Sequence, residues 1–150
     1  MATDRQYLLD TNILVYGFDA NEPRKQEQAL EVIDRVGRKR TGTLSVQTLS
    51  EFANVALYRL EEPLPPDEVA DQLELYSETF PILSLTTFVS IEAVRGVRDH
   101  SFSYFDAQIW AVARLNQVSV VLSEDFPSGA TVEGVTFIDP FSPDFRLDDL

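Results

Sequence analysis

Short apolar runs that alternate with longer amphipathic patterns are the feature of this chain that most restricts its fold. Residues 118–122 form the clearest buried run, and residues 7–9 form the first. The longer patterns repeat apolar residues at the three- and four-residue spacing of an α-helix. Strands that are apolar throughout need cover on both faces, which predicts an α/β fold with a mainly parallel sheet between helices.

The same patterns predict the individual elements. Strands are expected at 7–9, 43–46, 81–85, 118–122 and 135–138. Helices are expected at 23–39, along the apolar stripe 49–60, at 67–80, from Thr86 or Thr87 to about Val97, and at 105–116. The proline-rich segment 62–67 is typical of a loop between two helices. No linker stands out elsewhere, so we expect residues 1–150 to form a single domain.

Composition narrows the class of protein. The chain has no cysteine, which excludes disulfides and thiolate metal sites. No apolar run approaches the roughly 18–20 residues that span a membrane. Met1–Arg5 does not resemble a signal peptide, so a cytoplasmic location is expected. The net charge of −13 argues against nucleic-acid binding driven by the bare chain, and it suits either a basic protein partner or simple solubility.

Four acidic residues stand where ligands gather in a sheet of this kind, beyond the carboxyl ends of the strands. Asp10 follows the first strand directly, and Asp125 comes shortly after the fourth. Glu51 lies early in the helix after the second strand, and Asp106 lies on the apolar face of a later helix. We therefore expect these four side chains to converge.

Each acid also has a structural explanation that involves no ligand. Asp10 and Asp106 could cap the N-termini of helices, where backbone N–H groups lack partners. Glu51 could be a solvated surface residue. Asp125 could be a turn residue, and Glu124 beside it could take its place as a ligand.

Carboxylates brought together would repel one another, and that repulsion predicts a bound cation. Two like charges about 4 Å apart cost roughly 4 kcal/mol at an effective dielectric near 20, a penalty that protonation or a cation relieves. Oxygen ligands suit Mg²⁺ or Mn²⁺, and Ser123 could hydrogen-bond a ligand carboxylate or a phosphate oxygen. A zinc site is not expected, because zinc favours cysteine and histidine ligands and His100 is the one histidine. We expect His100 on the surface or in a loop. A cation would also supply the positive charge that a nucleic-acid enzyme needs.

Several rival motifs are absent from the sequence. There is no P-loop, no Gly-x-Gly-x-x-Gly and no Gly-x-Ser-x-Gly. A haloacid-dehalogenase-like phosphatase would have a second aspartate at the position of Asn12. A response-regulator receiver would have a lysine after a late strand, but the two lysines are Lys25 and Lys39.

Four short motifs occur together in the order and spacing of a known nuclease family. They are Asp10-Thr11-Asn12, Ser50-Glu51-Phe52, Phe105-Asp106-Ala107 and Ser123-Glu124-Asp125. With these motifs, nearly the whole chain resembles a PIN-domain ribonuclease, and within that superfamily the VapC toxins of toxin–antitoxin pairs. The most specific pieces of the resemblance are residues 8–16 and 103–109.

The resemblance implies a three-layer α/β/α sandwich and an endoribonuclease that depends on Mg²⁺ or Mn²⁺. The four acids would be its catalytic residues and metal ligands, with Thr11 and Asn12 bracing the site. RNA phosphodiesters would be hydrolysed by a metal-activated water. A cognate VapB-like antitoxin and a homodimer are implied as well. Two alternatives remain open: a PIN-like nuclease that acts on DNA, and a PIN-like module that binds a partner without catalysis.

One basic cluster could contact RNA phosphates. It consists of Arg35, Arg38, Lys39 and Arg40. Cations of this kind contact phosphates without reading base sequence. Positive charge is also favourable at the C-terminus of a helix, so the cluster has an explanation within the fold.

Overall fold

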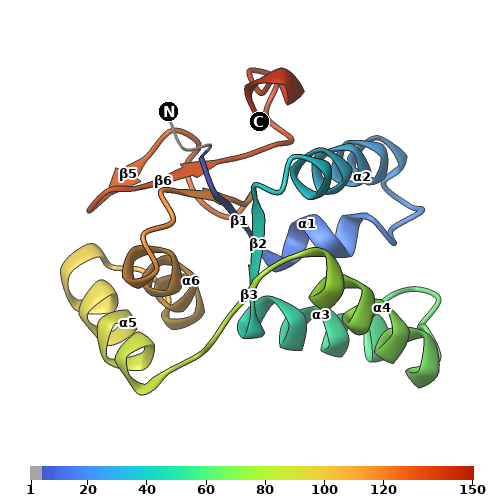
Figure 1. The fold of residues 1–150 in the computed structure, drawn as a ribbon, viewed down its shortest axis with the longest axis horizontal. Coiled ribbons are helices and arrows are strands. Elements are labelled where there is room, and N and C mark those ends of the chain that lie inside the picture. The colour runs from blue at the N-terminus through green and yellow to red at the C-terminus, as the bar shows by residue number, and fades with distance from the viewer. Residues whose placement is uncertain (1–4) are drawn as a thin grey trace.

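The computed structural model of the protein describes residues 5–150, which build a six-stranded sheet between two helical layers (Figure 1). The strands are β1 (Tyr7–Leu9), β2 (Gly42–Ser45), β3 (Ile82–Leu83), β4 (Val120–Leu122), β5 (Thr131–Val132) and β6 (Val135–Ile138). Their order across the sheet is β3-β2-β1-β4-β6-β5. All neighbouring pairs are parallel except β5 and β6, which confirms the predicted mainly parallel sheet.

The helices begin at residues that favour a helix start. They are α1 (Thr11–Tyr16), α2 (Pro23–Arg38), α3 (Val46–Tyr58), α4 (Pro66–Thr79), α5 (Thr87–His100), α6 (Tyr104–Leu115) and the 3₁₀ helix η1 (Leu147–Asp149). Proline, whose fixed φ suits the first helical turn, opens α2 and α4. The hydroxyl of Ser45 accepts the N–H of Thr48 at 3.1 Å and caps α3.

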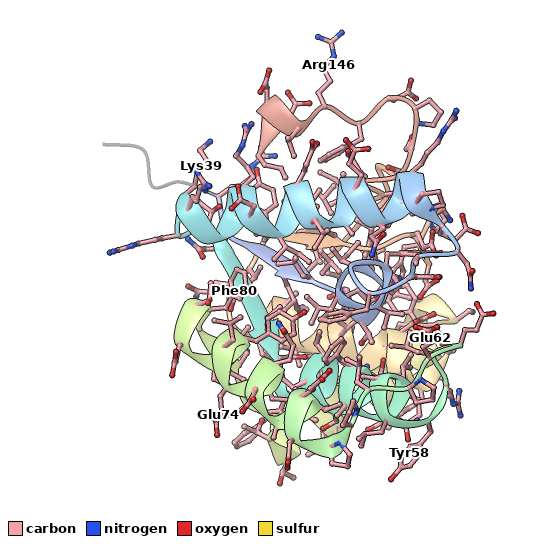
Figure 2. All side chains as sticks on the ribbon, turned by 90° about the vertical axis from the view of Figure 1, so that its right-hand side faces the viewer. Lys39, Tyr58, Glu62, Glu74, Phe80 and Arg146 are labelled. Carbon is pink, nitrogen blue, oxygen red and sulfur yellow. The ribbon has the colours of Figure 1, made fainter. Side chains whose placement is uncertain are left out.

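Side chains of the central strands divide the interior into two cores. Leu9 packs with α1, α2, α3 and α4 on one face, and Leu8 packs with α5 and α6 on the other. Phe80, at the end of α4, points into the first core beneath α2 (Figure 2). Because neighbouring residues of a strand point to opposite faces, two adjacent leucines are enough to anchor both helical layers. The three-layer α/β/α architecture is therefore confirmed.

The predicted elements are present, but several of their ends differ. β2 stops at Ser45 because this residue caps α3, so Val46 starts the helix instead of ending the strand. β3 covers only Ile82–Leu83 of the predicted 81–85, since Thr86 already caps α5. α5 continues past Val97 to His100.

The sequence patterns do not predict α1, β5 or η1. The apolar run of α1 contains β-branched residues and resembles a continuation of β1, but Asp10 breaks the strand and begins a helix. β5 pairs with β6 through a turn at Glu133 and Gly134, whose φ angles are 48° and 84°. Glutamate rarely adopts a positive φ, so this turn has no clear signal in the sequence.

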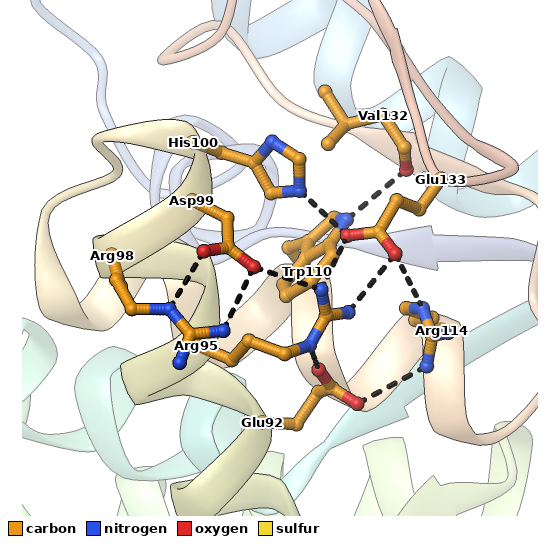
Figure 3. A network of polar contacts seen from close by, with 9 residues as sticks. All are labelled: Glu92, Arg95, Arg98, Asp99, His100, Trp110, Arg114, Val132 and Glu133. Atoms are coloured by element: carbon orange, nitrogen blue, oxygen red, sulfur yellow. Dashed lines mark hydrogen bonds and ion pairs between the residues drawn. The ribbon is translucent and has the colours of Figure 1, made fainter.

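An ion-pair network fastens this hairpin to α5 and α6 (Figure 3). The guanidinium of Arg95 meets the carboxylate of Glu133 at 3.0 Å, and Arg114 meets Glu92 at 3.1 Å. His100, expected on the surface or in a loop, is the last residue of α5, and its side chain is partly exposed. Its Nε2 lies 2.6 Å from the carboxylate of Glu133.

Within residues 5–150, no helix is both long enough and apolar enough to cross a membrane. The prediction about a signal peptide was read from Met1–Arg5, and residues 1–4 lie outside the described part of the chain.

Candidate active site

The topology brings the ends of β1 and β4 together at the centre of the sheet. These strands are parallel neighbours, with Leu9 opposite Leu122. The N–H of Asp10 donates to the carbonyl of Leu122 at 3.0 Å, just where both strands end. The residues that follow the two strands, Asp10 and Ser123, are therefore neighbours although 113 positions separate them.

Asp10 is buried, and each oxygen of its carboxylate accepts one hydrogen bond. Its side chain is the N-cap of α1, where Oδ1 accepts the N–H of Thr11 at 2.8 Å. Its Oδ2 accepts the hydroxyl of Ser123 at 2.7 Å. The capping explanation for this residue is thus confirmed, and the same carboxylate also lies beside the residues after β4.

Burial raises the pKa of Asp10 from 3.8 to about 6, since a carboxylate shielded from water is harder to ionise. The hydrogen bonds from Ser123 and Thr11 oppose this rise. The negative charges of Asp125 and Glu51 add to it. The electrostatics therefore show that carboxylates from three different elements act on one another here.

Glu51 is held by hydrogen bonds rather than lying free in solvent. One of its oxygens accepts the hydroxyl of Thr11 at 2.9 Å, and the other accepts the amide of Gln47 at 3.0 Å. The same amide donates to the carbonyl of Phe105 at 3.0 Å, which ties α3 to the start of α6. Gln47 was not singled out in the sequence, although its position one helical turn before Glu51 is a usable signal.

Asp125 is exposed at the turn after β4, and a set of hydrogen bonds holds it there. Its Oδ2 accepts the amide of Asn12 at 3.1 Å, and its N–H donates to the hydroxyl oxygen of Ser123 at 3.1 Å. Partial burial raises its pKa, and the charges of Asp106, Glu124 and Glu51 raise it further. Asp106, half-buried in the first turn of α6, is therefore within electrostatic reach of Asp125.

The predicted acids Asp10, Glu51, Asp106 and Asp125 thus form one electrostatically coupled group, the carboxylate cluster. The supporting residues predicted from the sequence lie among them. Thr11 bridges Asp10 and Glu51, and Ser123 bridges Asp10 and Asp125. Asn12 donates to both Ser123, at 3.2 Å, and Asp125.

Glu124, the possible substitute for Asp125, is engaged elsewhere. Its Oε2 lies 3.0 Å from the ammonium of Lys25, and its Oε1 accepts the hydroxyl of Tyr16 in a short hydrogen bond. Both oxygens therefore have partners. Asp125 is the residue of this pair whose carboxylate is coupled to Asp10. No local pattern in the chain indicates the contacts of Glu124 with Lys25 and Tyr16.

The donor set fits a hydrated divalent cation. Oxygen ligands without cysteine or histidine suit Mg²⁺ or Mn²⁺. The buried Oδ1 of Asn12 and Oε1 of Gln47 have no hydrogen-bond partner among the described residues, so they could accept from a cation's water ligands. Within residues 5–150, however, no three acid side chains are close enough to enclose a metal directly. A cation that keeps several of its water ligands would explain both the unpaired buried oxygens and the spacing of the acids. Mg²⁺ commonly keeps its waters in this way.

A cavity of about 410 Å³ opens beside this cluster. Its lining includes Thr11, Asn12 and Asp125. A larger cavity, of about 830 Å³, is lined by the start of β1, the residues before β2 and the C-terminal segment. None of the four clustered acids lines it, so the smaller cavity is the one next to the candidate chemistry.

The predicted basic cluster lies at the C-terminal end of α2 and in the residues that lead into β2 (Figure 2, Lys39). Arg35 and Lys39 donate to the carbonyl oxygens of Leu147 and Leu150, and Arg38 pairs with Asp34 at 2.9 Å. Arg40, with φ 57°, is exposed. These contacts favour the explanation within the fold, and a role of the cluster in RNA binding stays a prediction.

A family model described as "PIN domain" matches residues 7–126, a stretch that contains all four acids. No curated protein matches the chain.

Several solved structures share its fold. A toxin–antitoxin complex from Klebsiella pneumoniae is 18% identical with a TM-score of 0.64, covering 91% of this chain and 98% of that one. The DNA-bound VapBC of Salmonella typhimurium is 19% identical, with a TM-score of 0.64 and coverage of 91% and 99%. VapC20 of Mycobacterium tuberculosis, described as a sarcin–ricin loop cleaving toxin, is 18% identical, with a TM-score of 0.62 and coverage of 85% and 98%.

Proposed function

The chain belongs to the PIN domain family, and from this premise we propose that it is a metal-dependent endoribonuclease, the toxin of a VapBC-type pair. The observation that carries the proposal is the carboxylate cluster. Four acids from four parts of the chain are coupled electrostatically at the carboxyl ends of the central strands, where ligands of such sheets bind. The similar solved structures, which include toxin–antitoxin complexes, support the toxin assignment.

In this proposal the cluster is the catalytic centre. When bound, one or two Mg²⁺ or Mn²⁺ ions would activate water and stabilise the charge that develops on the phosphodiester. Asp10, held from both sides by Thr11 and Ser123, would fix the centre of the site. Glu51 and Asp106 would hold one side of it, and Asp125 would hold the exposed side next to the cavity.

The hydrogen-bonding residues have a second role in this proposal. Thr11, Asn12 and Ser123 donate to carboxylate oxygens and limit the directions in which these can turn. Fixed orientation matters because a cation and a phosphate have to meet ligands already in place.

The proposed partners are an RNA substrate, a cognate VapB-like antitoxin and a second copy of the chain, with residues 1–150 acting as one nuclease domain. A net charge of −13 suits a basic antitoxin. The acidic surface also means that the metal ions, rather than the bare chain, would attract the RNA backbone to the site.

The test is cleavage of structured RNA and of single-stranded DNA by the purified protein in Mg²⁺, Mn²⁺ or EDTA. We expect RNA cleavage with either metal and none in EDTA. Asp10→Asn keeps the shape of the side chain and should lower the rate by at least about 100-fold, the scale on which losing one electrostatic group acts. The matched control, Asp71→Asn, removes an exposed acid from α4 and should cleave like the wild type.

Cleavage by Asp10→Asn at the wild-type rate would overturn the assignment of the cluster. Cleavage of DNA but not RNA would support the DNA-directed alternative instead. In cells, expression of the wild type should stop growth, and expression of Asp10→Asn should not. Growth that is unaffected by an active nuclease would argue against the toxin role while leaving the nuclease intact.

A further inference from the structure

Lys25 of α2 lies beside the candidate active site, at the centre of a contact set that the carboxylate cluster does not include. Its ammonium lies 3.0 Å from Oε2 of Glu124 and 3.2 Å from the hydroxyl of Tyr16. That hydroxyl in turn donates to Oε1 of Glu124. The three side chains therefore form a closed triangle of hydrogen bonds, which we call the Lys25 clamp.

Aromatic rings enclose the ammonium from two more sides. It lies 4.8 Å from the ring centroid of Tyr16 and 5.6 Å from that of Phe141. The two rings contact each other edge to face at 5.0 Å. A cation over aromatic rings is stabilised by their electron-rich faces, so Lys25 is held by both its partner charge and its surroundings.

The clamp joins the segments that carry the catalytic acids. Tyr16 is the last residue of α1, the helix that Asp10 begins, and Glu124 directly precedes Asp125. Without Lys25, Glu124 would add an uncompensated negative charge directly beside Asp125. The turn after β4 would then be pushed away from the cluster by repulsion.

We propose that Lys25 is a positioning residue, which holds Glu124 away from the carboxylate cluster and fixes the turn that presents Asp125 to the metal. This inference rests on the proposed function and assigns Lys25 no contact with RNA. Partners that orient a metal ligand typically change metal affinity or activity by about 10- to 100-fold when they are removed. Lys25 would belong to this group through Glu124.

The test uses Lys25→Met, which keeps most of the aliphatic stem and removes the charge. We expect Mn²⁺ affinity, measured by titration calorimetry on the full chain, to fall by about 10-fold or more, and kcat to fall while KM for RNA stays within error. Lys25→Arg keeps a cation opposite Glu124 and should restore most of the affinity. The control Arg24→Met, at the exposed preceding position of α2, changes net charge equally and should behave as wild type.

A second readout needs no metal. Hydrogen exchange in EDTA should become faster for the amides of residues 123–126 in Lys25→Met, and should be unchanged in Arg24→Met. Glu124→Gln gives an independent variant, because it loses the ion pair without removing a side chain from α2. It also removes the charge that Lys25 compensates, so adding Lys25→Met to it should accelerate the exchange of these amides much less than Lys25→Met does alone.

Two results would overturn the proposal. A raised KM with unchanged Mn²⁺ affinity and unchanged exchange would make Lys25 a direct RNA contact. Unchanged affinity, kinetics and exchange would leave the clamp without any role. If the wild type binds no Mn²⁺ at all, the metal-dependent function fails, while the exchange data still decide whether Lys25 positions the turn.

Discussion

Asp10 shows at the scale of one residue how a structural role and a proposed catalytic role coincide. A carboxylate at the start of α1 satisfies a backbone N–H, and that position also turns it toward the residues after β4. The sequence presents these as alternatives, a helix cap or a ligand. The structure shows the cap, and the neighbouring acids make the same group the centre of the proposed site.

The raised pKa of Asp10 leads to a prediction about pH. A folded-state pKa of about 6, above the ordinary value of 3.8, means that the folded protein holds this proton more tightly than the unfolded chain. The stability that Asp10 contributes is therefore fully present below about pH 4 and is lost as the pH rises through about 6. Asp10→Asn, which cannot titrate, lacks this loss.

In EDTA, the unfolding free energy of Asp10→Asn relative to wild type should increase between pH 4 and pH 7. The expected gain is on the order of 3 kcal/mol, from 1.36 kcal/mol per pKa unit. Urea denaturation at several pH values would measure it. Curves that stay parallel over this range would show that Asp10 ionises as easily in the folded protein as in the unfolded chain.

The scale of elements is best seen where α5 crosses α6. Gly96 of α5 faces the fully buried ring of Trp110, and a Cβ at this position would lie 2.8 Å from it. The ring has little freedom to move, because its Nε1 donates to the carbonyl of Val132 at 3.1 Å and Arg95 covers its face. Close packing of these two helices therefore requires a residue without a side chain at position 96.

Gly96→Ala should lower the free energy of unfolding by roughly 1–2 kcal/mol, because overpacking outweighs the better helix propensity of alanine. Gly37→Ala in α2 is the matched control. Its new Cβ would lie 3.6 Å from the ring of Phe80, an ordinary contact. It should stabilise the protein by a few tenths to about 1 kcal/mol, and thermal or urea unfolding of both variants would decide. Equal effects of the two substitutions would contradict the account of this helix crossing.

At the scale of the whole molecule, the arrangement of strands decides where the acids meet. Acids from the ends of β1 and β4 and from α3 and α6 meet because the central strands are parallel neighbours. Their mutual repulsion is a cost that the folded state bears and the unfolded chain largely avoids. A cation that binds only the folded cluster should therefore stabilise the entire domain.

Mg²⁺ at about 100 times its dissociation constant should add roughly 2.7 kcal/mol to the folded state. For a chain of this length that corresponds to a rise in Tm of about 5–10 °C, at 2–4 °C per kcal/mol. Differential scanning calorimetry with Mg²⁺, Mn²⁺ and EDTA would measure it, and Asp10→Asn should show a smaller rise. A Tm that is the same with metal and with EDTA would contradict a site in the folded state.

Periodicity and motif order were enough to predict most of the architecture. The apolar runs and stripes correctly indicated the parallel sheet, both helical layers and the main helices. Strands buried on both faces are apolar throughout, and helices buried on one face repeat apolar residues every three or four positions. The short elements α1 and β5 show no such repeated pattern. A six-residue helix and a two-residue strand depend on a cap and on a turn with positive φ, rather than on a repeated pattern.

The sequence by itself determined which residues could form the site. The four acids, with Thr11, Asn12 and Ser123, are recognisable because short motifs and the ends of strands can be identified from neighbouring residues in the sequence. Only the tertiary structure decided how they are used: that Ser123 joins Asp10 to Asp125, that Thr11 holds Glu51, and that Lys25 occupies Glu124. These contacts link positions up to 113 residues apart, and their partners are set by packing across the sheet, which no local pattern records.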